Sequence, residues 1–248
     1  EQLQTTLSLY DLKSAELSKL NPDLVITQSL CEVCAVSLNA VTAAVESMDQ
    51  PAQVLNLNPE SIQDVLDSVV SVGEVTERVD VARRVVEKLE SRIATVRHRS
   101  SAIANRKRVL LLEWLDPPFS AGHWTPELIE LAGGDGIVGE PGERSRELQW
   151  DEIVGLDPDV IVIVCCGFDV PRTMREIPVL ERQAGWAELR CVQHNEVFVI
   201  DGSAYFNRPG PRLVDGLEIL AAALYPELHP LPEGVPSATN LSQQRPAR

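Results

Sequence analysis

Two stretches of the chain share one arrangement of polar and apolar positions. Residues 20–26 read Leu-Asn-Pro-Asp-Leu-Val-Ile, and residues 156–162, 136 positions later, read Leu-Asp-Pro-Asp-Val-Ile-Val. Each stretch follows a short amphipathic segment. Because proline disfavours helix in the residue before it, and a branched apolar run is typical of a parallel strand buried on both faces, each copy predicts a helix–turn–strand unit. Two such units predict two similarly built lobes.

A long apolar stripe lies between the two units. Residues 74–105 contain neither Gly nor Pro, and apolar residues recur there at alternating spacings of three and four. The stripe consists of Val79, Ala82, Val86, Leu89, Ile93 and Val96. This spacing predicts one face of a helix, and about 30 helical residues would span roughly 45 Å. A coiled-coil arm is one interpretation. Since strands are predicted on both sides, a rigid helix that joins two lobes is favoured.

The rest of the pattern alternates helices with strands, which is typical of parallel sheets covered by helices. The expected fold class is α/β, with two lobes of mainly parallel sheets flanked by helices and joined by one long rigid helix. The N-terminal lobe is expected over residues 1–73, the joining helix over 74–106 and the C-terminal lobe over 107–225. Residues 226–248 are rich in Pro, Ser and Gln and predict a disordered tail.

Length and charge limit the possible partners. The 248 residues suffice for two small lobes, and the net charge of −15 opposes binding to nucleic acid or to an anionic membrane surface. No segment approaches the ~20 apolar residues of a membrane span, and no signal peptide is recognisable. The chain begins at Glu1 rather than Met. Its targeting therefore stays open between extracytoplasmic and cytoplasmic locations.

Motifs of catalysis are missing from the sequence. It contains no G-x-S-x-G, H-E-x-x-H, P-loop or G-x-G-x-x-G pattern, and its four histidines lack metal-ligand spacing. We expect His98 and His229 to be solvated. Cys31 and Cys34 form one C-x-x-C pair, which suits either a metal or redox site or a buried structural pair. These features predict a binding protein without catalytic or metal-ligating residues.

Aromatic residues are concentrated in one part of the chain. Nine of the eleven lie between Trp114 and Phe206, several in predicted loops that follow strands. Ligands of open α/β sheets bind at the carboxyl ends of the strands, and aromatic loops suit a large, flat, partly apolar ligand. The candidate ligand-binding residues are Phe119, His123, Trp124, Phe168, Tyr205, Phe206 and Arg208, with Arg212 as a further cation.

Acidic residues precede both repeated Pro-Asp units. Glu16 lies in the first predicted helix, and Asp151 and Glu152 lie in the second. If the lobes are equivalent, these carboxylates occupy matching positions and could dock onto basic sockets of a partner. The favourable interaction of acids with a helix N-terminus explains the same residues equally well.

On these residues the chain resembles the substrate-binding proteins of iron-siderophore and cobalamin ABC importers, the class III family with a rigid interlobe helix. The resemblance covers residues 9–224. It rests on the Pro-Asp units, on Gly-His-Trp-x-Pro-Glu-Leu at 122–128, Ala-Gly-Gly at 132–134, Trp-Asp-Glu-Ile at 150–153 and Arg-Pro-Gly-Pro-Arg at 208–212. Residues 31–37, the His123-Trp124 pair and Cys166-Gly167-Phe168 resemble the cobalamin-binding branch.

The resemblance implies that the two lobes bind cobalamin or a related corrinoid and deliver it to an ABC permease–ATPase complex. The protein is then extracytoplasmic and needs no catalytic cofactor. Asp151, beside Glu152, matches the family's docking carboxylate in the second lobe, whereas the first-lobe position matches Ala15, next to Glu16. The family's opening strand and helix have no counterpart here, so the N-terminal lobe is expected to be incomplete.

Three alternatives stay open at this point. The same family also binds ferric siderophores and haem, which favour basic or tyrosine-rich pockets. The Cys31 and Cys34 pair is compatible with a cysteine-based metal or redox protein. A cytoplasmic corrinoid sensor or scavenger without a transporter is the third alternative.

Overall fold

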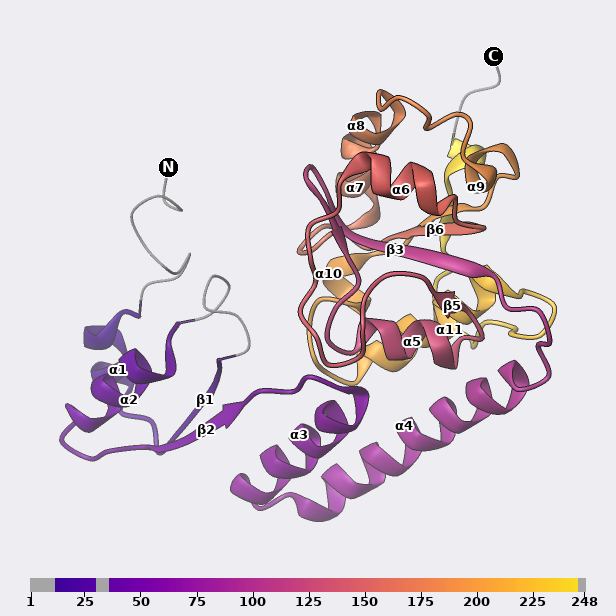
Figure 1. Ribbon diagram of the computed structural model, residues 1–248. Helices are drawn as coiled ribbons and strands as arrows, with labels where there is room; N and C mark the ends of the chain where they lie inside the picture. Colours follow the sequence, from indigo (N-terminus) through magenta and orange to yellow (C-terminus); the bar gives the residue numbers. More distant parts are fainter. Residues whose placement is uncertain (1–11, 30–35, 245–248) are drawn as a thin grey trace. The chain divides into compact units, whose positions relative to one another are not determined.

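The computed structural model describes residues 12–29 and 36–244, and it divides into two compact units, Glu1–Arg83 and Arg84–Arg248 (Figure 1). The predicted Cys31–Cys34 pair lies outside the described residues. No helix in the described ranges is long and apolar enough to cross a membrane.

The first unit alternates helices and strands, as the sequence predicts. Its elements are α1 (Ser14–Leu20), β1 (Leu24–Gln28), α2 (Leu38–Glu46), β2 (Gln53–Leu57) and α3 (Ile62–Val75). β1 and β2 pair in parallel, from Leu24 opposite Gln53 to Gln28 opposite Leu57. A small core around Val41, Val45 and Met48 packs against the strands.

The long helix is shorter than predicted. α3 ends at Val75, and α4 (Val79–Ser100, 22 residues) carries the chain into the second unit. The prediction of one helix over 74–106 is wrong at both ends. Glu77 adopts a left-handed conformation (φ 55°), and the Arg78 amide donates to the Gly73 carbonyl at 2.6 Å. A Cβ on Gly73 would lie 2.4 Å from the Ala82 Cβ, so this tight turn depends on the glycine.

The second unit holds one larger sheet. Its strands are β3 (Arg108–Leu115), β4 (Pro118–Ser120), β5 (Asp135–Gly136), β6 (Val160–Ile163), β7 (Val197–Val199) and β8 (Thr239–Asn240). The order is β4-β3-β6-β7-β8, with β5 also paired to β3. β3, β6 and β7 are parallel, whereas β4 and β8 are antiparallel edge strands. This arrangement confirms the α/β fold class.

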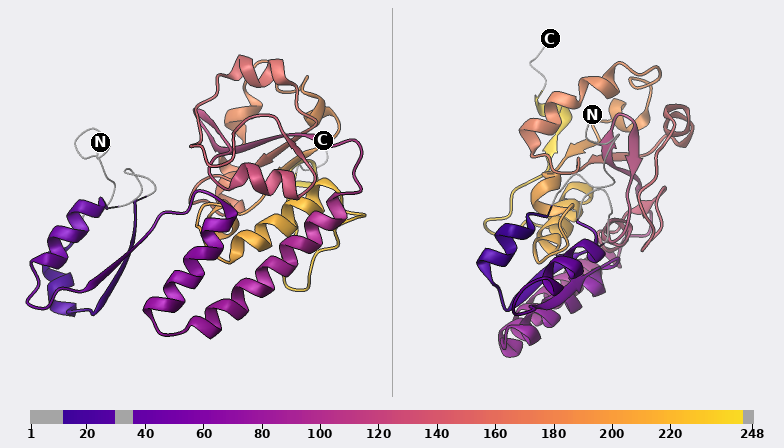
Figure 2. Two further views of the ribbon diagram at one scale, coloured as in Figure 1. Left: turned by 60° about the horizontal axis from the view of Figure 1, so that its bottom comes forward. Right: turned by 90° about the vertical axis from the view of Figure 1, so that its left-hand side faces the viewer.

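Helices cover both faces of this sheet (Figures 1 and 2). One face carries α6 (Trp150–Leu156), α7 (Val170–Glu176) and α8 (Pro178–Glu181), and the other carries α5 (Thr125–Leu131) and α11 (Arg212–Leu224). The shorter helices α9 (Arg190–Gln193) and α10 (Gly202–Tyr205) flank β7 in sequence. The apolar runs Val109–Leu112 and Val160–Ile163 are completely buried, as predicted for strands covered on both faces.

Both repeated units form the predicted helix, turn and strand. α1 ends at Asn21 (φ 45°) and α6 ends at Asp157 (φ 41°), each in the left-handed conformation that Asn and Asp tolerate best among residues with a Cβ. The capping amides donate back to the carbonyls of Leu17 at 3.1 Å and Ile153 at 3.2 Å. Pro follows each cap and lies two residues before the next strand, so the two helices end by the same means.

The predicted disordered tail is wrong for residues 226–244. β8 pairs with β7, and the following 3-10 helix η2 (Leu241–Gln244) buries Leu241 to 5% exposure. His229, expected to be solvated, is only 3% exposed, with Nε2 3.3 Å from the Ser100 hydroxyl. The Pro- and Ser-rich composition of this segment gives no indication that Leu241 and His229 are buried. Each of these side chains packs against elements distant in sequence.

Candidate functional site

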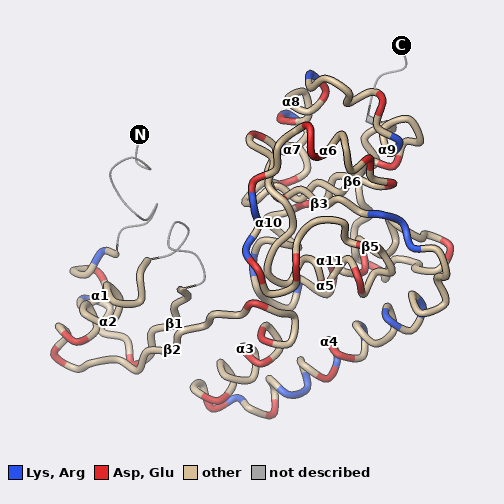
Figure 3. The backbone as a smooth tube through the Cα atoms, viewed as in Figure 1, with Lys and Arg blue, Asp and Glu red and all other residues tan. Residues whose placement is uncertain are grey.

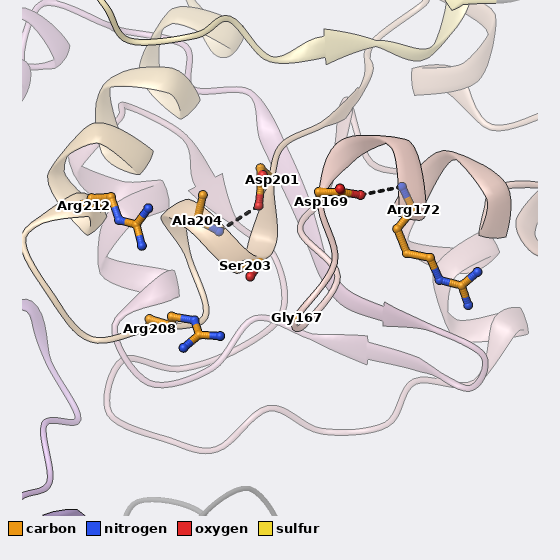
Figure 4. Close-up of a pocket in the computed structure, with 8 residues that line it drawn as sticks. All are labelled: Gly167, Asp169, Arg172, Asp201, Ser203, Ala204, Arg208 and Arg212. Atoms are coloured by element: carbon orange, nitrogen blue, oxygen red, sulfur yellow. Dashed lines mark hydrogen bonds between the residues drawn. The ribbon is translucent and has the colours of Figure 1, made fainter.

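The carboxyl ends of β3, β6 and β7 lie at one edge of the second unit's sheet, and a cavity of about 480 Å³ opens between the loops that follow β6 and β7. We call it the strand-end pocket. Figure 4 shows the residues that line it, which are Gly167, Asp169, Arg172, Asp201, Ser203, Ala204, Arg208 and Arg212. Its volume lies within the range of small-molecule sites, about 300–1,000 Å³.

Hydrogen bonds hold the two loops together. The Gly167 amide donates to the Asn207 side chain at 3.0 Å, and the Ser203 amide donates to the Phe168 carbonyl at 3.1 Å. Gly167 has φ 74°, a conformation that glycine adopts without steric cost. The loops therefore form one preorganised wall.

The two carboxylates of the pocket are already engaged. Asp169 caps α7 by accepting from the Arg172 amide, and Asp201 caps α10 by accepting from the Ala204 amide, each at 2.7 Å (Figure 4). Acids at helix N-termini are stabilised by the amides and the helix dipole. Both side chains thus position the pocket's helices and have limited capacity left for a ligand.

The three arginines differ in how they are held. Arg172 forms an ion pair with Glu176 at 2.8 Å, and its guanidinium lies 4.9 Å from the centre of the Phe168 ring. Arg208 and Arg212 are exposed and have no side-chain partner within the described part of the chain. Two guanidiniums are therefore available to bind carboxylate, phosphate or other anionic oxygens, for which their planar geometry is suited.

This cluster is a local departure from the charge of the protein. Acidic residues occur throughout both units (Figure 3), in keeping with the net charge of −15. An anionic ligand is repelled by that overall charge. Arg208 and Arg212, which have no described side-chain partner, can offset the repulsion locally and favour an anion at this edge of the sheet.

A second, smaller cavity of about 210 Å³ lies next to the strand-end pocket and shares Arg172 with it. We call it the aromatic pocket, because the Trp114 and Phe168 rings lie 5.0 Å apart in it, tilted by 53°. Its lining consists of Trp114, Leu115, Asp116, Cys165, Phe168, Arg172, Glu176 and Val179.

The structure brings only part of the predicted ligand set to these pockets. Phe168 lines the aromatic pocket and Arg208 the strand-end pocket. Within the described chain, Phe119, His123 and Tyr205 line neither of them.

Trp124 and Phe206, which the sequence predicts as ligand contacts, are buried among the core residues of the second unit. Their side chains are 5% and 2% exposed, and the Trp124 indole donates to the Phe206 carbonyl at 2.8 Å. Their position in predicted loops suggested accessibility that the packing of α5 and α10 removes.

Gly122, the first residue of the Gly-His-Trp segment, has a structural role. Glu113, on β3, accepts hydrogen bonds from the Ser145 hydroxyl at 2.8 Å, the Thr125 hydroxyl at 3.1 Å and the Gly122 amide at 3.2 Å. Burial raises the pKa of this carboxyl, partly offset by the three donors. A Cβ on Gly122 would lie 2.3 Å from the Ser145 nitrogen, so only glycine fits.

Four residues of the strand-end pocket are not predicted as site residues from the sequence: Arg172, Asp169, Asp201 and Ser203. The sequence does carry a signal for Arg172 and Asp169. The segment Asp-x-Pro-Arg at 169–172 lies two residues after Gly167 and combines a helix cap, a proline of the first helical turn and a cation. Asp201 likewise follows β7 and caps a helix. Polar residues directly after buried parallel strands indicate this pocket better than the nearby aromatic residues do.

The predicted docking carboxylates are exposed or partly exposed. Glu16 lies in the first turn of α1, and Asp151 and Glu152 lie in that of α6. Arg146 binds Glu152 through two hydrogen bonds, and this ion pair lowers the pKa of the carboxyl. Asp151 has no side-chain partner among the described residues. Asp151 is therefore the second unit's more available carboxylate.

The two buried cysteines of the second unit are unsuited to redox or metal chemistry. Cys165 and Cys191 are buried, and burial raises the pKa of Cys165 to about 11 and that of Cys191 to about 12. Thiols with such pKa values are poor nucleophiles and poor metal ligands at neutral pH. Within residues 12–29 and 36–244, no cluster of three His, Cys, Asp or Glu could hold a metal ion.

Comparison with known proteins adds to this geometry. The family model described as periplasmic binding protein matches residues 11–204. A curated relative, the uncharacterized ABC transporter substrate-binding lipoprotein YvrC of Bacillus subtilis, is 24% identical over 217 residues, which is 84% of this chain. The chain spans 63% of that relative's length, less than two thirds.

Solved structures share the fold. A periplasmic heme-binding protein from Pseudomonas aeruginosa superposes with a TM-score of 0.74 at 18% identity, covering 92% of this chain and 81% of its own. An ABC transporter substrate-binding protein from Listeria monocytogenes gives 0.72 at 17% identity, with coverages of 86% and 81%. The periplasmic vitamin B12-binding protein BtuF of Vibrio cholerae gives 0.65 at 17% identity, with 86% and 78%. At these identities the likeness extends to the fold alone.

Proposed function

The chain belongs to the periplasmic binding protein family, and on that premise we propose that it is the ligand-binding component of an ABC importer rather than an enzyme. Its cargo would be captured at the carboxyl ends of β3, β6 and β7 and passed to a permease–ATPase complex. The name of the Bacillus subtilis relative supports this role and, with it, an extracytoplasmic location.

The proposed ligand is a bulky metal chelate that carries anionic groups, a ferric siderophore or haem. The observation that carries this proposal is the pair Arg208 and Arg212, which line the strand-end pocket without a described side-chain partner. Exposed arginines gain most from ligands that present paired anionic oxygens. Carboxylates of haem and ionised oxygens of a siderophore provide such groups.

A corrinoid is the second candidate. Its support is the aromatic pocket beside the arginines, together with the resemblance of Cys166-Gly167-Phe168 to the cobalamin-binding branch. The other two parts of the resemblance to the cobalamin-binding branch give less support. Trp124 is buried, and most of residues 31–37 lie outside the described residues. Its single phosphate also offers the arginines fewer anionic groups.

Thermal unfolding with a ligand panel tests the proposal. We expect haemin or a ferric tris-catecholate siderophore to raise the melting temperature, because a ligand that binds only the native state stabilises it by about 2.7 kcal/mol at 100 times its Kd. For a chain of this size that corresponds to roughly 5–10 °C. Cyanocobalamin is the third panel member. A shift with cyanocobalamin alone would transfer support to the corrinoid, and no shift with any compound would contradict the proposed function.

Asp151 is the proposed docking residue of the second unit, with Glu16 as the candidate of the first. Replacing Asp151 by alanine should weaken binding to the partner permease–ATPase complex about tenfold, since an interfacial charge would lose its basic partner. Surface plasmon resonance with the complex in nanodiscs measures this effect. The matched control is Glu188→Ala, an exposed carboxylate of the same unit. Equal affinities for both variants would rule out docking through Asp151, and Glu16→Ala tests the first unit in the same way.

A further inference from the structure

A third cavity of the second unit, of about 610 Å³, lies at the opposite edge of the sheet from the strand-end pocket. Lys107 and Glu196 line it and directly precede the parallel strands β3 and β7, so the cavity lies at the amino ends of these strands. The end of α11 and residues from the segment 225–243 supply its other walls, and we call it the C-terminal pocket. It shares no lining residue with the other two pockets, and its volume suits a small molecule.

The end of α11 leaves three hydrogen-bond acceptors at this pocket. The last four carbonyls of a helix have no donor within the helix, and in α11 the Tyr225 amide binds one of them at 2.9 Å. No donor among the described residues reaches the other three, those of Ala222, Ala223 and Leu224, and these residues line the pocket. Pro226 follows and has no amide hydrogen with which to satisfy Ala222. Since α11 also has no basic residue in its last turn, a bound cation would complement the negative end of the helix dipole.

The charged side chains of the pocket leave one negative charge uncompensated. Lys107 forms an ion pair with Glu196 at 3.1 Å, and its ammonium lies 5.7 Å from the centre of the Tyr225 ring. This pair carries no net charge. The exposed carboxylate of Glu227 has no side-chain partner within the described chain, so the pocket as a whole favours a cation over an anion.

His229 adds a buried nitrogen without a partner. The residue lines the pocket and is 3% exposed, and no described group forms a hydrogen bond with its Nδ1. Burial lowers the pKa of His229, with a smaller contribution from the charge of Arg99, so the ring is neutral at pH 7. When Nε2 donates to the Ser100 hydroxyl, 3.3 Å away, Nδ1 is an acceptor. The free polar groups of the pocket are then acceptors, which call for a ligand with several donors.

Apolar side chains form much of the remaining wall. Phe198 of β7 and Leu231 line the pocket and are partly exposed there, and Pro230 lies beside them in the lining. Such a wall suits an organic body rather than an inorganic ion. The net charge of −15 repels an anion from the strand-end pocket, but it attracts a cation to this one.

We propose that the C-terminal pocket binds an organic ammonium ion with an apolar body, whose N–H groups donate to the free carbonyls at the end of α11 and whose charge is balanced by Glu227. An ammonium group has three donors and no acceptor, which matches the free acceptors described above. An anion would find only the Lys107 ammonium, which is already paired with Glu196. This second site goes beyond the proposed function and does not depend on it.

Two probes with the same body and opposite charges test the site. They are 2-phenylethylammonium and 3-phenylpropionate, in which a carboxylate replaces the ammonium. In a ¹H–¹⁵N NMR titration we expect the ammonium to shift the backbone amide signals of His229 and Ala238, which line the pocket, with a Kd on the order of 1 mM. The signals of Gly167 and Ser203, in the strand-end pocket, should stay in place. The carboxylate should bind at least about tenfold more weakly, because it lacks donors and meets the end of the helix dipole.

Two variants, each with a matched control, test the contacts. Glu227→Gln should weaken 2-phenylethylammonium about threefold, since an exposed charge contributes modestly. Ala223→Leu places a larger side chain at the pocket wall and should weaken it about tenfold, while leucine keeps the helix propensity of α11 high. The controls are Glu233→Gln, in the same segment, and Ala94→Leu, at an exposed position of α4; both lie outside the pocket lining. Circular dichroism checks that each variant is folded.

Several results would overturn the site. They are unmoved His229 and Ala238 signals, equal affinities for the two probes, or unchanged affinity in either folded pocket variant. If Ala223→Leu does not fold, the exposed position of Glu227 lets Glu227→Gln decide by itself. Weaker binding in the pocket variants, together with wild-type affinity in both controls, is the result that supports an ammonium site.

Discussion

Replacing both Arg208 and Arg212 by alanine is expected to weaken binding of an anionic chelate about 100-fold or more. Hydrogen bonds to charged groups contribute about 1.5–3 kcal/mol each, and the double variant removes at least two of them. The loss should be smaller in high salt, because part of the attraction is screened. Fluorescence quenching or calorimetric titration measures the effect.

The control for this variant is Arg182→Ala, which removes an exposed arginine at the end of α8, outside both pockets. It should leave the Kd within a factor of two. A double variant that binds the chelate within threefold of the wild-type protein would contradict the role given to the arginines. A similar loss in Arg182→Ala would show that overall charge, rather than the pocket, controls affinity.

The second large effect concerns stability. Arg92 on α4 binds both Glu218 oxygens, at 3.0 and 2.6 Å, and Asp215 at 2.5 Å. Glu218 is only 9% exposed, and the two carboxylates raise the pKa of the guanidinium. Arg92→Ala would leave a buried carboxylate unpaired on α11. We expect the free energy of unfolding to fall by about 2–3 kcal/mol, less than for a fully buried pair because Arg92 is partly exposed.

Tryptophan fluorescence in a urea titration is suited to this measurement, since all four tryptophans lie in the second unit. The control is Arg97→Ala, which removes an exposed arginine of the same helix. It should change the free energy of unfolding by less than about 0.5 kcal/mol. Equal midpoints for Arg92→Ala and Arg97→Ala would show that the ion cluster contributes nothing to the stability of this unit.

Local patterns predict much of this fold. The branched apolar run at 160–163 predicts a buried parallel strand, and β6 is one, because strands covered on both faces leave no polar alternation. The helix break at 76–78 has no such signal. Neither Gly nor Pro occurs there, yet Glu77 takes the left-handed conformation at the turn where Ala82 approaches Gly73 closely.

The sequence predicts the candidate site less well than it predicts the fold. Aromatic residues near strand ends can point into the core or toward a ligand, and the pattern does not distinguish Trp124, which is buried, from Phe168, which lines a pocket. Arg172 gains its importance from α7, whose first turn carries it to both cavities. Such a role depends on tertiary packing rather than on spacing along the chain.

A crystal structure of the protein with a bound anionic chelate tests the central claim most directly. We expect anionic oxygens of the chelate within about 3 Å of the guanidinium nitrogens of Arg208 and Arg212. A chelate bound elsewhere on the protein, with both guanidiniums still without a partner, would contradict it.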